Sequence, residues 1–106
     1  MSAIRWGEIY WARLDPSVGA EIQKTRPIVI LSVNPLNRAR RTVIAVPLST
    51  AATPIEYINV ALTGGSVARC DQLRTLDKSR LSSKIGSLSK NDLDAISEGV
   101  RKVIGL

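Results

Sequence analysis

The one clear helical pattern in this chain lies at its C-terminal end, and it limits what the preceding residues can build. Ser89 is a typical N-cap, Asp92 takes the reciprocal capping position three residues later, and Gly105 follows the last apolar residue. Between these signals, apolar residues recur at the spacing of one helix face: Leu93, Ile96, Val100, Val103 and Ile104. The sequence therefore predicts an amphipathic C-terminal helix that needs a sheet to pack against.

The residues before this helix form short apolar, β-branched runs separated by turn residues. The runs predict one helical turn at 78–81 and strands at 4–14, 28–33, 42–48, 56–62, 67–70 and 85–88. Turn residues mark 15–19, 34–37 and 63–66. The basic cluster 38–41 is either a solvated hairpin tip or a rim that contacts phosphate. About five to seven short strands and one terminal helix predict a mainly β fold with a C-terminal helix, a small curved antiparallel barrel or sandwich.

The first predicted strand, 4–14, is apolar on both faces. Period-2 alternation divides its central residues between the faces, with Ile9 and Trp11 on one and Tyr10, Ala12 and Leu14 on the other. Such a strand is expected to be covered on both sides. We expect its aromatic residues, together with Trp6 and Tyr57, to belong to the core, with base stacking as the less frequent alternative.

The length of the chain favours one domain. Its 106 residues, 44% of them hydrophobic, fit a single domain over 1–106. A domain of this length buries only about two thirds of the surface of its unfolded chain, so its stability is modest unless a second subunit covers apolar surface. A homo-oligomer is therefore expected.

The chain is strongly basic, with a net charge of +6. Arginine supplies most of its basic residues, and the planar arginine fork matches phosphate oxygens in a bidentate way. Nucleic acid or another polyanion is the favoured partner. The alternative is a soluble protein whose charges only keep it dispersed.

Histidine is absent, and Cys70 is the only cysteine. These two facts exclude an internal disulfide, an imidazole base and the ligand sets typical of zinc. We expect no metal and no cofactor. The sequence has no signal-peptide pattern and no apolar run of membrane-spanning length, so we expect a cytoplasmic protein that does not enter a membrane.

A polar loop leads directly into the most apolar strand. Residues 15–26 show no helical or strand period, and loops of this length in small domains are often functional, with a plain surface connection as the alternative. Pro27 fixes its own φ and pushes Arg26 toward an extended conformation. The Arg26 guanidinium therefore leaves the backbone in few directions, and an anion is its natural ligand.

Groups that suit chemistry at a phosphate lie in three separated places. They are Glu21, Lys24, Thr25 and Arg26 in the first loop, Ser49 and Thr50 after the third predicted strand, and Arg69, Asp71 and Gln72 in a further predicted strand, 69–77. In RNA the 2′-hydroxyl can itself attack the adjacent phosphorus. The protein then needs a carboxylate base, arginines that stabilise the developing charge and a hydroxyl that donates to a phosphoryl oxygen. Arg26 suits charge stabilisation rather than proton transfer, because the arginine pKa exceeds about 12.

Several segments carry a family resemblance in their order and spacing: Gly7–Trp11, Leu14–Pro16, Val18–Glu21, Lys24–Pro27, Val46–Thr50 and Arg69–Asp77. Together they resemble the MazF/PemK/Kid family of toxin endoribonucleases, or mRNA interferases. The resemblance implies an SH3-like or CcdB-like barrel, a homodimer, and metal-independent cleavage of single-stranded RNA that leaves a 2′,3′-cyclic phosphate and a 5′-hydroxyl. It also implies a cognate acidic antitoxin that occupies the basic RNA groove.

The resemblance also implies roles for individual residues. It gives a catalytic set of Arg26, Ser49 and Asp71, and a substrate-binding set of Glu21, Lys24, Thr25, Thr50, Arg69 and Gln72. Ser49 stands where the family usually has threonine and keeps the hydroxyl, while Thr50 is an alternative source of it. The carboxylate that acts as base stays open, because Glu21 and Asp71 can each form a structural ion pair instead.

Two other functions remain open at this stage. A CcdB-like toxin of the same barrel type would bind DNA gyrase through its terminal helix and would not need Arg26 with a hydroxyl. A nucleic-acid-binding barrel without activity would bind RNA in a salt-dependent way and yield no product. The motifs identify neither the RNA sequence that is read nor the antitoxin.

Overall fold

The computed structural model describes residues 3–16, 18–21, 24–50 and 59–106. Its strands are β1 (Glu8–Arg13), β2 (Thr25–Ile30), β3 (Thr42–Ser49), β4 (Val60–Ala61), β5 (Val67–Ala68), β6 (Arg74–Asp77) and β7 (Leu81–Ser87). The helices are α1 (Asn34–Ala39) and α2 (Lys90–Ile104), with two short 3₁₀ turns, η1 (Cys70–Gln72) and η2 (Lys78–Arg80). The predicted mainly β architecture with a C-terminal helix is confirmed.

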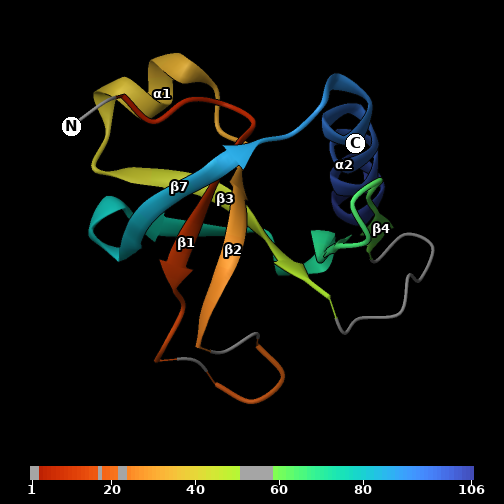
Figure 1. Cartoon of the computed structure of the whole chain (residues 1–106), viewed down its shortest axis with the longest axis horizontal. Helices are drawn as coiled ribbons and strands as arrows, with labels where there is room; N and C mark the ends of the chain where they lie inside the picture. The colour runs from red at the N-terminus through yellow and green to blue at the C-terminus, as the bar shows by residue number, and fades with distance from the viewer. Residues whose placement is uncertain (1–2, 17, 22–23, 51–58) are drawn as a thin grey trace.

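The strands form one antiparallel sheet in the order β4-β5-β3-β2-β1-β7, with β6 also beside β3. One edge of β3 pairs with β2, and its other edge pairs first with β6 and then with β5. Figure 1 shows the sheet curling, with α2 beside β4 at one end and α1 at the other. The last residues of β3 therefore lie where the curled sheet meets the part of the molecule that α2 covers.

Two apolar clusters lie on the two faces of this sheet. Inside the curl are Ile4, Tyr10, Ala12, Leu14, Ile28, Ile30, Val43, Ala45 and Leu76. Under α2 are Val29, Val46, Leu48, Leu62, Ala68, Cys70 and Ile96, with Ile9 packed against them. The alternation predicted for residues 9–14 is thus correct, but only Ile9 on the second face is covered by this cluster. Trp11, on the same face, is 40% exposed and Trp6 is 47% exposed, which corrects the expected place of both in the core; Tyr57 lies outside the described residues.

The boundaries of β2 differ from the prediction at both ends. Thr25 and Arg26 were expected in the loop, but they pair with Arg13 and Ala12 of β1. Pro27 is tolerated inside this strand because the register of β2 with β3 starts only at Ile28, which leaves Pro27 at an edge. The sequence signal for a loop was the absence of a strand period in 15–26, and pairing with β1 overrides it.

A short helix, α1, replaces the turn predicted at 34–37. Pro35 stands in its first turn, where a missing N–H costs nothing. Asn37 is only 1% exposed, and its side-chain amide donates to the Ser32 carbonyl at 2.8 Å, while the Ser32 hydroxyl donates to the Asn37 side chain. This buried pair fixes α1 to the chain before it, and the hydrophobic pattern gave no sign of it.

The segment 69–77 is not one strand, because η1 interrupts it and pairing with β3 resumes only at Arg74. Strand β7 is longer than the predicted 85–88, and η2 matches the helical turn predicted at 78–81. Of the strand predicted at 56–62, only Val60–Ala61 is a strand, and its first three positions lie outside the described residues.

The predicted limits of the terminal helix are correct. The Ser89 hydroxyl accepts the Asp92 N–H at 3.2 Å, and Gly105 ends the helix in the left-handed region at φ 76°. The reciprocal bond expected from Asp92 is wrong: its carboxylate accepts the Thr63 hydroxyl at 2.7 Å and the Thr63 N–H at 3.2 Å. This contact ties the start of α2 to the turn between β4 and β5. Within the described residues, no helix is long and apolar enough to span a membrane.

Candidate active site

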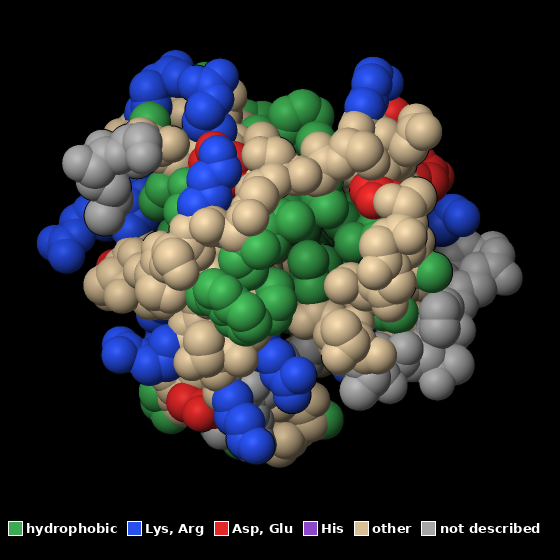
Figure 2. All heavy atoms as spheres, viewed as in Figure 1, with side chains coloured by type: hydrophobic (Ala, Val, Ile, Leu, Met, Phe, Trp, Pro, Cys, Tyr) green, Lys and Arg blue, Asp and Glu red, His purple; other side chains and the backbone are tan. Residues whose placement is uncertain are grey.

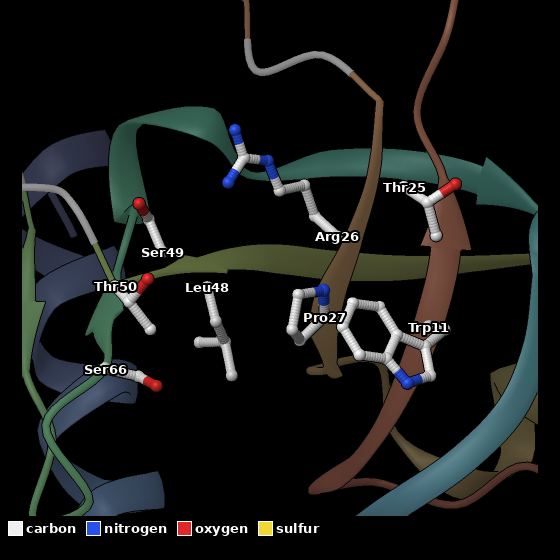
Figure 3. A pocket seen from close by; sticks show the side chains of 8 residues that line it. All are labelled: Trp11, Thr25, Arg26, Pro27, Leu48, Ser49, Thr50 and Ser66. Carbon is white, nitrogen blue, oxygen red and sulfur yellow. The ribbon is translucent and has the colours of Figure 1, made fainter.

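A cavity of about 280 Å³ opens where β2 and β3 diverge. Figure 3 shows the residues that line it, which are Trp11, Thr25, Arg26, Pro27, Leu48, Ser49, Thr50 and Ser66. The register of β2 with β3 ends at Ile28 opposite Pro47. Beyond that pair the strands separate, and three residues of β2, the last two residues of β3 and the following Thr50 line the gap.

Arg26 and Ser49 face each other across this gap. Continuing the β2–β3 register by two residues from Ile28 and Pro47 places Arg26 opposite Ser49, on one face of the sheet. In Figure 3 the Arg26 guanidinium extends from β2 toward the end of β3, where the Ser49 hydroxyl lies. The two residues, predicted from separate segments, therefore come together in one cavity. A guanidinium and a hydroxyl that line one cavity can both contact one phosphate group.

Thr25 and Thr50 add two further hydroxyls to the same cavity. Both were predicted to bind substrate. Because Thr50 lines the cavity beside Ser49, the geometry leaves either residue able to supply a hydroxyl. Ser66, from the turn between β4 and β5, contributes another hydroxyl that the sequence did not indicate.

The carboxylates lie in a second depression next to η1. This space of about 430 Å³ is lined by Glu21, Asp71, Gln72, Leu73, Arg74 and Thr75. Asp71 is exposed, whereas Glu21 already accepts the Val18 N–H at 2.6 Å within its own loop. The structure thus brings Glu21, Asp71 and Gln72 together, but in a space separate from Arg26 and Ser49.

Arg69 lines neither space, but it contacts a residue near each of them. Its backbone N–H donates to the Pro47 carbonyl at 2.9 Å, two residues before Ser49. Its Nε lies 3.7 Å from the Asp71 carboxylate, which is an ion pair too long for a hydrogen bond, and this buried nitrogen has no hydrogen-bond partner within the described residues. The ion pair that was left open for Asp71 is therefore present, with Arg69 and in a loose geometry.

Lys24 lines neither of these spaces. Its carbonyl accepts the Leu14 N–H at 2.9 Å, which closes the long loop, and its φ of 70° lies in the left-handed region. A lysine in this conformation is uncommon and carries backbone strain. Lys24 therefore bears on the cavity through the loop it closes, directly before Thr25.

Cys70 can be excluded as a nucleophile. It is fully buried under α2, and burial, followed by the nearby Asp71 charge, raises the pKa of its thiol to about 11. A Cβ at Gly99 would lie 2.9 Å from the Cys70 sulfur, so the helix and η1 pack closely at this point. The cysteine is a small apolar packing residue.

A second polar cluster lies at the start of β1. The Glu8 carboxylate accepts the Arg5 N–H at 2.7 Å and the Tyr10 hydroxyl at 2.9 Å, and it pairs with Lys84 at 2.6 Å. Burial acts to raise the pKa of Glu8, but these hydrogen bonds and the Lys84 charge outweigh it and lower that pKa. Burial and then Glu8 itself raise the pKa of Tyr10 to about 12.

Known proteins resemble this chain over almost its whole length. A family model described as a PemK-like, MazF-like toxin of type II toxin-antitoxin systems matches residues 5–104. Endoribonuclease PemK of Escherichia coli is 37% identical over 78 residues, which span 67% of this chain and 59% of PemK, less than two thirds of its length. Endoribonuclease MazF2 of Mycobacterium bovis is 31% identical over 108 residues, which span 93% of this chain and 95% of MazF2.

A solved structure has the same fold. An endoribonuclease from a mycobacterial species, in complex with its cognate antitoxin, superposes with a TM-score of 0.83 at 25% identity and covers 98% of this chain and 97% of its own. The family model, the relatives of known name and the solved structure all indicate the same family. The chain belongs to the PemK-like, MazF-like family of toxins of type II toxin-antitoxin systems.

Proposed function

We propose that this toxin is an endoribonuclease that cleaves single-stranded RNA, mRNA in the cell, at a specific sequence and without a metal ion. The observation that carries the proposal is the cavity in which Arg26 and Ser49 stand opposite each other. The names of the relatives, endoribonuclease PemK and endoribonuclease MazF2, support the same activity. They favour it over gyrase binding by a CcdB-like toxin without nuclease activity.

The scissile phosphate binds between Arg26 and Ser49. The 2′-oxygen of the preceding ribose attacks phosphorus, a bond from phosphorus to this oxygen forms, and the bond to the 5′-oxygen breaks. The products are a 2′,3′-cyclic phosphate and a 5′-hydroxyl. Arg26 stabilises the negative charge that grows on the phosphoryl oxygens, and the Ser49 hydroxyl donates a hydrogen bond to one of them. Thr50 is the alternative donor.

Asp71 is the proposed base that takes the proton from the 2′-hydroxyl, with Glu21 as the alternative. Ser49 pairs with Val67, and Asp71 follows Val67 by four residues. Since an extended chain spans at most about 3.6 Å per residue, the Asp71 Cα lies within about 14 Å of the Val67 Cα. The base must lie within hydrogen-bond distance of the 2′-hydroxyl beside the bound phosphate, so a movement of Asp71 toward Arg26 and Ser49 on RNA binding is part of the proposal. The 5′-oxygen receives its proton from water or from a group on the protein.

RNA contacts in this scheme extend beyond the reacting atoms. Gln72, beside Asp71, and Thr25, in the cavity, suit hydrogen bonds to the sugar or bases. Arg69 adds positive charge beside Asp71, with its Nε 3.7 Å from that carboxylate. Lys24 adds exposed charge at the start of β2 and suits a more distant phosphate.

The proposed partners follow from the family. The solved complex of an endoribonuclease with its cognate antitoxin supports an antitoxin for this chain, and a net charge of +6 suits an acidic one. We propose a homodimer, because several apolar side chains are exposed, among them Val18, Val33, Ile104 and Leu106. An mRNA substrate places the activity in the cytoplasm. One toxin domain over 1–106 agrees with the extent of the family match.

The decisive experiment incubates the purified chain with a long RNA in the presence of a chelator and maps the 5′ ends of the products. We expect cleavage at one short sequence, with 5′ ends that a kinase phosphorylates without prior phosphatase treatment. A substrate with a single 2′-deoxyribose before the cleaved bond should resist cleavage. Cleavage of the deoxy substrate, or activity that requires a metal, would contradict the mechanism.

A further inference from the structure

Trp11 occupies an unusual place for a tryptophan in the middle of a strand. Its neighbours in β1, Tyr10 and Ala12, are buried, yet Trp11 is 40% exposed and lines the same cavity as Arg26 and Ser49. Figure 2 shows hydrophobic side chains exposed across the middle of this face, between the sheet and the part covered by α2. A large aromatic side chain left open beside a basic group requires an explanation other than core packing.

The backbone at Trp11 is held from both sides. It pairs with Pro27 of β2, and its carbonyl accepts the Ser82 hydroxyl of β7 at 3.3 Å. In Figure 3 the indole lies beside the Pro27 ring, and Pro27 lies between Trp11 and Arg26. A tryptophan on a fixed strand has only two side-chain torsions to order, so it offers a flat surface at low entropic cost.

The cavity has the size and lining that one nucleotide needs. Its volume of about 280 Å³ is at the lower limit of small-ligand pockets, which suits a single base and its sugar. Thr25, Thr50 and Ser66 place hydroxyls around it, and each can donate or accept a hydrogen bond at the edge of a base. Arg26 supplies the phosphate contact on the other side of Pro27.

From this arrangement we infer that Trp11, supported by Pro27, is a stacking surface for one base next to the scissile phosphate. The inference rests on the proposed RNA cleavage and names the subsite that fixes one nucleotide beside Arg26. Stacking is tolerant of base identity, because every base has a π-face. Trp11 therefore sets the position of the RNA, and the hydroxyl edges add any preference for a base.

The first test measures binding without chemistry. Trp6 and Trp11 are the only tryptophans, so the variant Trp6→Phe reports on Trp11 alone and the variant Trp11→Phe reports on Trp6 alone. Trp6 is 47% exposed and lines none of the described cavities near Arg26. Both variants are titrated with single-stranded DNA heptamers of each base composition, which keep bases and phosphates but lack the attacking hydroxyl. We expect saturable quenching of Trp11 fluorescence and little change for Trp6.

The second test measures cleavage of the mapped RNA by stacking and non-stacking variants. Trp11→Leu keeps an apolar side chain without a π-face, so kcat/KM should fall about tenfold, mostly through KM. Trp11→Phe should lose less than Trp11→Leu, and the matched control Trp6→Leu should cleave like the parent chain. Replacing each nucleotide in turn by an abasic one should reveal one position whose loss weakens the parent chain but not Trp11→Leu.

The outcomes separate this inference from the proposed function. If oligonucleotides quench Trp11 fluorescence but no RNA is ever cleaved, the result supports base stacking on Trp11 and contradicts the proposed RNA cleavage. If the parent chain cleaves RNA while Trp11→Leu and Trp6→Leu have the same kcat/KM, the result supports the proposed RNA cleavage and contradicts base stacking on Trp11. A Trp11 signal that responds to an acidic antitoxin peptide but to no oligonucleotide would also overturn the inference.

Discussion

β1 carries a polar region at each end, and the two regions use their charges differently. At its start Glu8 is 7% exposed, and its carboxylate binds a backbone N–H, a hydroxyl and the Lys84 ammonium. Farther along, Trp11 faces a cavity that also contains Arg26 and Ser49. The Glu8 cluster satisfies itself, which stabilises the fold. The Arg26 cavity instead brings a guanidinium and several hydroxyls to the lining of an open space that a ligand can enter.

Of all the substitutions in the Arg26 cavity, the removal of Arg26 should lower RNA cleavage the most. We expect Arg26→Ala to lower kcat for RNA cleavage about 10²- to 10³-fold, because the charge on the phosphoryl oxygens loses its main stabiliser. The free energy of unfolding should fall by less than the roughly 2.7–4 kcal/mol of transition-state stabilisation that is lost, although Arg26 is half-buried in β2. Single-turnover cleavage and urea unfolding measure the two quantities.

Arg26→Lys is the matched control, because it keeps the charge and loses the fork. It should retain part of the activity that Arg26→Ala loses. Arg26→Ala with parental activity, or with loss of folding as its only defect, would remove Arg26 from the chemistry.

The next largest effect on RNA cleavage should come from Ser49, and it should exceed that of the neighbouring Thr50. A hydrogen bond to a charged group contributes about 1.5–3 kcal/mol, so losing the Ser49 hydroxyl should slow cleavage about ten- to a hundredfold. Thr50→Ala, its matched control one residue away, should lose less than about threefold. The rates are compared at saturating RNA. If Thr50→Ala has the larger defect, the roles of the two residues are exchanged.

In the Glu8 cluster, the removal of Glu8 itself should lower the free energy of unfolding the most. Glu8→Ala leaves the buried Tyr10 hydroxyl and the Arg5 N–H without their acceptor, which should cost about 2–3 kcal/mol of unfolding free energy. Urea unfolding measures this loss. Cleavage by the folded fraction should equal that of the parent chain, and a selective loss of kcat would show that the two regions are not separate.

The Glu8 cluster also predicts a pH dependence of stability. Because the folded pKa of Glu8 is lowered, the carboxylate stabilises the fold above its unfolded pKa of about 4.5, and this contribution disappears as pH falls through the folded pKa. Because the folded pKa of Tyr10 is raised to about 12, stability should also fall as pH rises from about 10 to 12.

Measuring the free energy of unfolding across pH tests both the acid and the alkaline loss of stability. Glu8→Gln should reduce the acid dependence without abolishing it, since hydrogen bonds from Ser79 also lower the pKa of Asp77. Tyr10→Phe should reduce the alkaline dependence without abolishing it, because the raised pKa of the buried Cys70 thiol also makes stability fall at alkaline pH. A parent curve that is flat from pH 3 to 5 would contradict the role of Glu8.

The sequence predicts more of the architecture than of the site, for physical reasons. Alternation in 9–14 and the helix limits at Ser89 and Gly105 are local signals, and the structure agrees with both. The site depends on register. Arg26 lies opposite Ser49 only because β2 and β3 pair over Ile28–Ile30 and diverge on the side of Arg26. Periodicity contains no information about which strands pair.

The same reason explains the misplaced Trp11 and the divided site. An apolar run cannot reveal that α2 covers Ile9 and leaves Trp11 open. The family resemblance places Arg26 and Asp71 in one catalytic set, but η1, which no pattern predicted, directs Asp71 into a neighbouring depression. Asp71 can therefore reach the ribose beside Arg26 only if it moves when RNA binds.

The smallest expected effect concerns the loop that joins β1 to the cavity. Lys24 has φ 70°, a conformation that costs an L-residue about 1 kcal/mol and that glycine adopts freely. Lys24→Gly and Lys24→Ala both remove the ammonium, so they differ only in backbone preference. Lys24→Gly should be the more stable by about 0.5–1 kcal/mol in urea unfolding. Both should weaken RNA binding equally, with a shallower salt dependence than the parent chain, because each loses one phosphate contact. If Lys24→Ala binds RNA as the parent does, Lys24 acts only through the conformation of the loop.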